Sequence, residues 1–158
     1  MEVEKHIVTT ERRDIDIVDV TLLSIDEYRN CRAAIPSIYK YWWWLRSPGY
    51  YSDNAAYVNT DGGVNDFGYY VNYDEVAVRP ALKIKNLDSF NLGDKFDLAG
   101  CTWTVISEDL ALCDSVIGEV AFREDWRAKD ANDYAKSDIK KWLGNWAAKN
   151  DLKISRKE

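Results

Sequence analysis

Residues 42–82 read WWWLRSPGYYSDNAAYVNTDGGVNDFGYYVNYDEVAVRPAL, and this stretch is the most informative part of the chain. Apolar and aromatic residues begin it (42–45) and end it (76–82), which is typical of two buried strands. The residues between these two frames are mostly Tyr, Asn, Asp, Ser and Gly. Tyrosine provides a large amphipathic contact at a low cost in entropy, and Asn and Ser make adaptable hydrogen bonds. The stretch therefore predicts a recognition surface carried by a stiff frame.

The predicted binding residues are the polar and aromatic residues between the frames. They are Tyr50, Tyr51, Asp53, Asn54, Tyr57, Asn59, Asp61, Asn65, Asp66, Tyr69, Tyr70, Asn72, Tyr73 and Asp74. A two-residue alternation cannot bury all six tyrosines, because many of them adjoin Asn, Asp or another Tyr. A hydrophobic core made of the same rings is the alternative. We favour an exposed surface, since Tyr is enriched at interfaces, where its ring contacts apolar groups and its hydroxyl contacts water.

The chain around this segment predicts further strands and two helices. Within the stretch, strands are expected at 42–46, 55–58, 68–71 and 76–84, with Asp61-Gly62-Gly63 as a turn and Pro80 at an edge or bulge. Upstream, alternation over 15–22 predicts a strand, and Ser24 with Glu27 forms a capping box for a helix ending near residue 31. Downstream, strands are expected at 95–98, 101–106 and 110–113, followed by a helix over 137–148.

These elements predict an α+β fold: a small, twisted, mostly antiparallel sheet that carries loops 49–57, 59–67 and 69–75, with the two helices packed against it. Residues 1–13 are polar and are expected to form a flexible N-terminal tail. Residues 14–158 are expected to form one domain, and residues 86–91 are the only candidate seam between two halves.

Charge is concentrated in the segment between the frames. The chain has a net charge of −6, which argues against nucleic-acid binding through phosphates. Residues 47–78 contain five acids (Asp53, Asp61, Asp66, Asp74 and Glu75) and no Lys or Arg, which gives −5. Arg46 and Arg79 bracket this acidic segment. We expect both to be structural, satisfying loop carbonyls or pairing with an acid.

Catalytic and metal chemistry find little support. His6 is the only histidine and lies in the polar tail, so neither a Ser–His–acid triad nor a histidine-rich metal site is expected. Cys31, Cys101 and Cys113 have no CxxC spacing and are expected to be reduced thiols. The acidic loops do not have EF-hand spacing. We expect no enzyme activity, no cofactor and no bound metal, and neither a signal peptide nor a membrane span is visible.

The frame residues carry a family resemblance. Residues 43–49 (WWLRSPG), Val58, Gly62, Val71 and residues 78–82 (VRPAL) resemble a bacterial and prophage family whose activity is unknown. Some relatives are variable proteins of diversity-generating retroelements. These proteins have a C-type-lectin-like fold, and the retroelement rewrites selected Asn codons in their genes to codons for Tyr, Asp, Ser and other residues. The resemblance implies that fold, and it implies that the predicted binding residues are the variable positions. Ala77 departs from the family, which usually has Gly there.

The second half resembles the same family in an unexpected order. Gly93, Phe96, Gly100, Trp103, Val105, Ala111 and Leu112, and then Tyr134, Ser137, Asp138, Ile139, Lys141, Trp142 and Leu143, are similar to a segment that precedes WWLRSPG in relatives. Here this segment follows. The resemblance therefore implies either a rearranged single domain or two adjacent pieces that complete each other.

Together these observations predict a non-enzymatic binding module of phage or prophage type that recognises a protein or a glycan through its Tyr/Asn/Asp loops. The alternative is an acidic, phage-encoded inhibitor of a host defence enzyme, similar in kind to anti-CRISPR proteins, that occupies a basic nucleic-acid channel. The expected partner is thus a protein, with a basic host protein as one candidate, or a glycan. We expect no direct binding to nucleic acid or membrane, and a location in the host cytoplasm or in a phage particle. The oligomeric state is left open.

Overall fold

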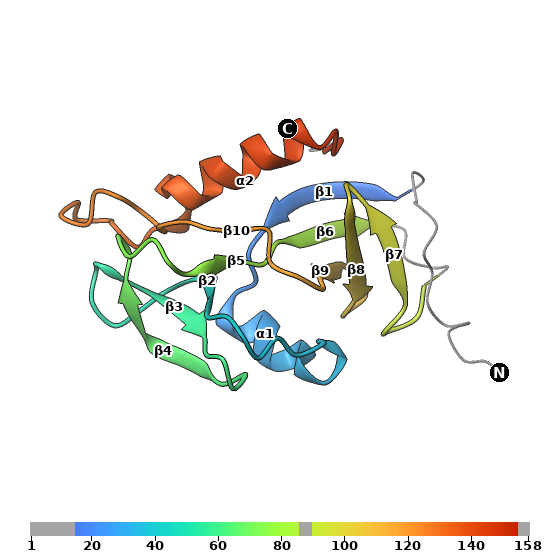
Figure 1. Cartoon of the computed structure of the whole chain (residues 1–158), viewed down its shortest axis with the longest axis horizontal. Helices are drawn as coiled ribbons and strands as arrows, with labels where there is room; N and C mark the ends of the chain where they lie inside the picture. Colours follow the sequence, from blue (N-terminus) through green and yellow to red (C-terminus); the bar gives the residue numbers. More distant parts are fainter. Residues whose placement is uncertain (1–14, 86–89, 155–158) are drawn as a thin grey trace.

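The computed structural model describes residues 15–85 and 90–154, and it is an α+β fold (Figure 1). Two mostly antiparallel five-stranded sheets and two α-helices make up the structure in these ranges. The α+β class is therefore confirmed, but the single sheet expected from the sequence is two sheets. The predicted tail (1–13) and part of the candidate seam (86–89) lie outside the described residues.

The first sheet, sheet A, has its five strands in the order β1-β6-β9-β8-β7, and every neighbouring pair is antiparallel. Its strands are β1 (Asp16–Thr21), β6 (Ala81–Lys85), β7 (Lys95–Leu98), β8 (Cys101–Val105) and β9 (Leu110–Cys113). Two of them precede residue 86 and three follow residue 90. Both halves of the chain therefore contribute to one sheet, through the pairing of β6 with β9.

The second sheet, sheet B, carries the predicted loops. Its order is β10-β5-β2-β3-β4, and β2 and β5 are its one parallel pair. Its strands are β2 (Trp43–Pro48), β3 (Asn54–Val58), β4 (Val64–Tyr70), β5 (Ala77–Val78) and β10 (Gly118–Glu119). The predicted strands at 42–46 and 55–58 correspond to β2 and β3. The strand predicted at 68–71 is the end of a longer one that begins at Val64.

The prediction of one strand over 76–84 is wrong, because the chain leaves sheet B after β5 and enters sheet A at β6. Pro80 lies at this change of sheet, where its lack of an N–H removes a donor from a continuous ladder. Arg79 is 1% exposed and holds the crossing in place. Its Nε donates to the Cys113 carbonyl at 2.7 Å, and its Nη2 donates to the Pro36 carbonyl at 2.7 Å. The guanidinium also lies over the Trp43 ring, 5.0 Å from its centroid.

Both α-helices begin at the N-cap residues that the sequence predicts. Helix α1 (Ile25–Cys31) begins at Ser24, whose side chain accepts from the Glu27 N–H while the Glu27 carboxylate accepts from the Ser24 N–H. Helix α2 (Asp138–Lys149) begins after Ser137, whose side chain accepts from the Lys140 N–H. Short 3₁₀ turns follow α1 at Arg32–Ala34 (η2) and precede α2 at Tyr134–Lys136 (η3).

Helix α2 lies along one side of the molecule beside β1 and β10 (Figure 1). Ile139, Leu143 and Ala147 on its inner face are buried. These three residues join a core cluster that contains Trp44 of sheet B and Trp103 of sheet A. The apolar face of α2 therefore packs against a core that both sheets share.

Candidate functional site

The loops at one end of the β3–β4 ribbon are tied together by backbone hydrogen bonds. The Gly49 N–H donates to the Asn54 carbonyl at 2.7 Å, the Tyr50 N–H to the Phe67 carbonyl at 2.7 Å, and the Val71 N–H to the Asp53 carbonyl at 2.8 Å. Buried or closely packed backbone groups need such partners. The loops after β2 and after β4 are therefore held to each other and to the strands.

A side chain from the second half of the chain reinforces this arrangement. Asn132 Nδ2 donates to the Tyr51 carbonyl and to the Asn54 carbonyl, both at 3.1 Å. Asn132 lies in the long connection between β10 and α2, which passes the end of β4 in Figure 1. The loop that carries Tyr50 and Tyr51 is thus braced by a residue about eighty positions away in the sequence.

Two glycines permit the close approach of these strands. A Cβ at Gly49 would lie 2.4 Å from the Phe67 carbonyl oxygen, and one at Gly68 would lie 2.7 Å from the Ala55 carbonyl oxygen. Gly68 also has a φ of +97°, which L side chains rarely adopt. The frame of the site therefore depends on the absence of side chains at both positions.

Five aromatic rings are exposed at this end of sheet B, and we call them the tyrosine surface. They are Tyr50, Tyr51, Phe67, Tyr70 and Tyr73. Tyr50 is 72% exposed although it stacks on Phe67 with the ring centroids 5.4 Å apart, and Tyr51 meets both of these rings edge-on. Each ring in this trio is held by the other two, and more than half of its area remains open to solvent.

A second group of rings lies behind the tyrosine surface. Trp42 stacks on Tyr57 at 5.1 Å and meets Tyr69 edge-on at 5.4 Å. Tyr69 in turn contacts Tyr70 at 5.6 Å and Tyr73 at 4.9 Å. Edge-to-face and offset-stacked pairs of this kind stabilise beyond their buried area. Tyr69 is half-buried and connects the exposed Tyr70 and Tyr73 to the sheet.

Two of the predicted binding residues are corrected by the structure, because Asn54 and Tyr57 are only 4% and 5% exposed. Both lie in β3, which is buried over its whole length. The Tyr57 hydroxyl accepts from Asn65 Nδ2 at 3.0 Å, and burial raises the pKa of Tyr57 above its ordinary value. These two residues support the surface from inside and do not form part of it.

The remaining predicted residues fall at two ends of the ribbon. One end holds Tyr50, Tyr51, Asp53, Tyr69, Tyr70, Asn72, Tyr73 and Asp74. The other holds Asn59 and Asp61 in the β3–β4 turn, with Asn65 and Asp66 close to it on β4. The two sets share β4, where Asp66 and Tyr69 are three residues apart, which is about 10 Å at roughly 3.3 Å per residue. The turn belongs instead with α1, because the Tyr28 hydroxyl donates to the Gly62 carbonyl at 2.7 Å.

The acids of this segment are mostly exposed. Asp61, Asp66, Asp74 and Glu75 are all exposed, and within the described ranges the one ion pair among them joins Asp66 to Arg29 at 3.8 Å. The nearby Glu75 carboxylate is the main reason that the pKa of Tyr73 is raised. The surroundings of the tyrosine surface are therefore negatively charged.

The two flanking arginines are structural, as predicted. Arg79 holds the change of sheet, and Arg46 donates to both carboxylate oxygens of Glu27, at 2.6 and 3.1 Å. Sequence reasoning missed Phe67 and Asn132. Phe67 follows the acidic residue Asp66 within the polar segment, which was a usable signal, whereas nothing local connects Asn132 to this site.

The comparisons place the chain in a family. The family model for a domain of unknown function, DUF6273, matches residues 3–86, and the chain belongs to this family. The matched range includes α1 and every strand from β1 to β6, and hence both frame motifs. The match identifies only this unknown-function family and shows no connection to retroelement variable proteins or to lectins. Comparisons with curated proteins and with solved structures gave no match.

The residues that the structure describes contain neither a metal-binding cluster nor a membrane-spanning helix. Across residues 15–85 and 90–154, no three His, Cys, Asp or Glu side chains are grouped so that they would hold a metal ion. Among the helices of the described ranges, none has the length and apolar character needed to cross a bilayer.

Proposed function

We propose that this protein is a non-enzymatic binding module that recognises a protein or a glycan through the tyrosine surface. The observation that carries the proposal is the trio Tyr50, Tyr51 and Phe67, whose rings contact one another while each stays more than half exposed. Large exposed aromatic groups of this kind are typical of binding sites and are enriched among residues that dominate binding energy.

The fixed geometry of the surface favours binding over a solvated loop. The loop backbones are hydrogen-bonded to each other and to Asn132, and the rings constrain one another's rotamers. Ordering a mobile side chain on binding costs about 0.5–1.5 kcal/mol, so rings that are already ordered lose less. Tyr and Phe also have few rotatable bonds, which reduces this cost further.

We also propose the closer kinship implied by the sequence motifs: a C-type-lectin-like fold whose exposed loop residues are varied by a retroelement. Supporting it, Tyr50, Tyr51, Tyr70, Asn72 and Tyr73 are exposed near the ends of β2 and β4, on a frame built by the WWLRSPG and VRPAL residues. A reverse transcriptase and a template repeat beside the gene are expected. Sequences of close relatives that vary equally in the frame and in the loops would contradict this proposal.

The experiment compares two multiple variants of the whole chain. In the surface variant, Tyr50, Tyr51, Phe67 and Tyr70 are changed to Ser. In the control variant, Tyr39 and Leu92, which are 73% and 67% exposed elsewhere, are changed to Ser. Each immobilised protein is exposed to bacterial lysate and, separately, to a glycan panel. A partner retained by wild type and control but lost by the folded surface variant is the expected result. Equal retention by all three proteins would refute the site.

A second function is favoured by the exposed acids. We propose as the alternative that the acidic face occupies a basic nucleic-acid channel of a host defence enzyme, since charge complementarity steers such complexes. Asp61, Asp74 and Glu75 are exposed and form no ion pair within the described residues. Changing them to Asn, Asn and Gln would then weaken binding and flatten its salt dependence, and nucleic acid would compete. Partner binding that is insensitive to salt and to these changes would favour the aromatic contact instead.

A further inference from the structure

A cavity of about 200 Å³ lies at the end of sheet B where β2 and β5 begin and β3 and β10 end. These strand ends meet because β2 is parallel to β5 and antiparallel to β3, and β10 is antiparallel to β5. The lining includes Trp42 before β2, Tyr73 and Glu75 before β5, and Glu119 in β10. Typical sites for drug-sized ligands have roughly 300–1,000 Å³, so this cavity suits a smaller molecule or a single chemical group.

Two of the aromatic rings that line the cavity are close enough to contact one small ligand. Trp42 is held by its neighbours, since it stacks on Tyr57 and meets Tyr69 edge-on. Tyr73, which is 38% exposed, also meets Tyr69 edge-on. Because both rings contact Tyr69, at 5.4 and 4.9 Å between centroids, the centroids of Trp42 and Tyr73 are no more than about 10 Å apart. A single cation can therefore lie within about 6 Å of both centroids, which is the range of a cation–π contact.

Two carboxylates beside these rings are not neutralised. Glu75 accepts a hydrogen bond from the Tyr73 hydroxyl at 3.4 Å, and Glu119 lies opposite Ala77, just beyond Glu75 in the chain. Both side chains are exposed, and neither forms an ion pair within the described residues. The charge of Glu75 is the main reason that the pKa of Tyr73 is raised, so the negative potential extends to the ring.

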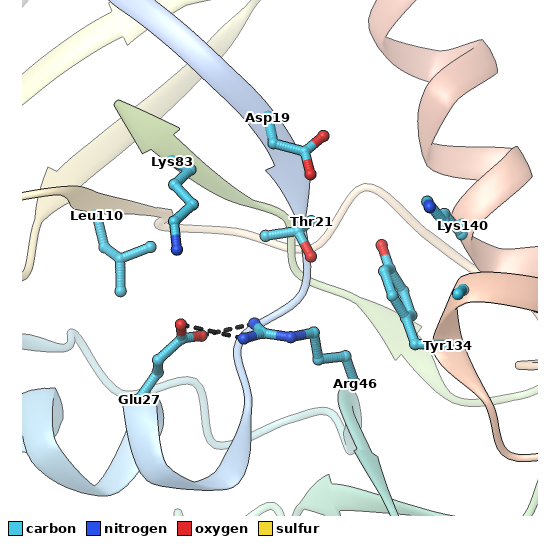
Figure 2. Close-up of a pocket in the computed structure, with 9 residues that line it drawn as sticks. Asp19, Thr21, Glu27, Arg46, Lys83, Leu110, Tyr134 and Lys140 are labelled. Carbon is cyan, nitrogen blue, oxygen red and sulfur yellow. Dashed lines mark hydrogen bonds and ion pairs between the residues drawn. The ribbon is translucent and has the colours of Figure 1, made fainter. Parts of the chain in front are cut away.

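The pocket in Figure 2, between sheet A and α1, differs in this respect because its carboxylate is already paired. Both carboxylate oxygens of Glu27 accept from the Arg46 guanidinium. Burial acts to raise the pKa of Glu27, but the hydrogen bond and charge of Arg46 and the Ser24 N–H together hold that pKa below its ordinary value. A cationic ligand there would compete with Arg46, whereas the cavity of sheet B offers carboxylates that no cation holds.

Charge and ring chemistry together select the ligand. Of the described residues that line the cavity, Lys40 is the only basic one, and its Nζ lies over the Tyr41 ring, 5.8 Å from the centroid. Lys40, Glu75 and Glu119 give the lining a charge of −1, which one monovalent cation neutralises. A Ca²⁺ ion would need roughly six to eight oxygen ligands, which two carboxylates do not supply. A quaternary ammonium group carries one charge, presents apolar methyl groups and is attracted by aromatic rings.

We propose that this cavity binds a quaternary ammonium group, with the rings of Trp42 and Tyr73 against its methyl groups and the carboxylates of Glu75 and Glu119 balancing its charge. The site does not depend on the proposed function. It lies at the start of β2, whereas Tyr50 follows the end of that strand, and it shares only Tyr73 with the tyrosine surface. Free choline and a trimethylated lysine of a protein both present this group, so both are used as probes.

The test is an NMR titration of the whole, isotope-labelled chain with choline chloride. Sodium chloride is the matched salt, and 3,3-dimethyl-1-butanol is the uncharged molecule of the same shape. A Kd on the order of 1–10 mM is expected for so small a ligand. The expected result is a set of saturable shifts at residues 40–42, 60, 73–75 and 119, with 3,3-dimethyl-1-butanol bound at least about fivefold more weakly. Equal binding of the uncharged molecule, shifts that do not saturate, or the same shifts with sodium chloride would overturn the proposal.

Variants make the assignment specific. Tyr73→Leu, and Glu75→Gln combined with Glu119→Gln, are each expected to raise the Kd for choline at least about fivefold, which is roughly 1 kcal/mol. All three positions are exposed, so these variants are expected to fold. Tyr73→Phe keeps the ring and should lose clearly less affinity than Tyr73→Leu. Glu108→Gln is the charge control, because Glu108 is exposed in the turn between β8 and β9 and does not line the cavity. Choline affinity unchanged in the first two variants, or reduced equally by Glu108→Gln, would refute the site.

Two further comparisons locate the site and identify the source of the group. The surface variant retains Trp42, Tyr73 and both carboxylates, so it should bind choline as wild type does, and loss of choline binding in that folded variant would overturn the location. Nε-trimethyllysine amide carries the same group on a longer stem. Binding tighter than that of choline would support the proposal with a methylated protein as the source, and weaker binding would support it with a free small molecule.

Discussion

Replacing Arg79 by methionine tests whether the change of sheet between β5 and β6 depends on this buried guanidinium. Arg79 donates to the Cys113 and Pro36 carbonyls, both at 2.7 Å, and lies over the Trp43 ring. Its burial lowers the pKa to about 10, so it remains charged at neutral pH. Methionine is unbranched and has no polar hydrogen but is shorter than arginine, so the variant removes the donors while filling part of the space.

The magnitude follows from these contacts. Leaving a buried carbonyl without its donor costs about 1–3 kcal/mol, which gives about 2–6 kcal/mol for two carbonyls. A desolvated cation–π contact adds about 2 kcal/mol. Removing the buried charge relieves part of its desolvation penalty and offsets some of this loss. We therefore expect Arg79→Met to lower the free energy of unfolding by about 3–5 kcal/mol, a large share of the roughly 5–15 kcal/mol of an ordinary domain.

The assay is equilibrium unfolding in urea, followed by tryptophan fluorescence and far-UV circular dichroism. The matched control is Arg127→Met, because the Arg127 guanidinium lies over the Trp126 ring at 4.9 Å but both side chains are exposed. This control is expected to change stability by less than about 0.5 kcal/mol. Arg79→Lys, which keeps the charge and one donor, should fall between the two. A loss below about 1 kcal/mol in Arg79→Met, or equal losses in both methionine variants, would refute the reasoning.

Two further predictions concern the frame and the response to acid. Gly68→Ala should lower the free energy of unfolding by about 2–4 kcal/mol, because it adds a collision with the Ala55 carbonyl to the strain of positive φ. Gly93→Ala is its control, with a similar φ of +90° and no atom within 4 Å, and about 1–2 kcal/mol is expected; equal losses in urea unfolding would contradict the collision. Because the folded pKa of Glu27 lies below its ordinary 4.5, its contribution to stability is present above that pH and is lost as the pH falls through the folded value. The urea midpoint of Glu27→Gln should therefore change less between about pH 7 and pH 3 than that of wild type, and equal changes would show that Glu27 does not contribute.

Local patterns were enough to predict much of the secondary structure. The capping box at Ser24, the N-cap at Ser137 and the alternation before residue 22 each depend on residues a few positions apart, and each element was found. The exposure of Tyr50, Tyr51, Tyr70 and Tyr73 also agrees with the argument that crowded polar neighbours prevent burial. The prediction of a single strand over 76–84 was wrong, because the periodicity of an apolar run does not reveal which sheet a strand joins.

The α+β class, the capped helices and a polar, tyrosine-rich segment between two apolar frames could all be predicted from the amino-acid sequence, because these features follow from interactions between near neighbours. The three-dimensional arrangement was needed to show that Asn54 and Tyr57 are interior and that Asn132 braces the Tyr51 loop. Those facts depend on the pairing of β6 with β9 and on the packing of α2, which bring together residues that are distant along the chain. No local pattern encodes such distances, since they arise from the burial of apolar faces that many residues share.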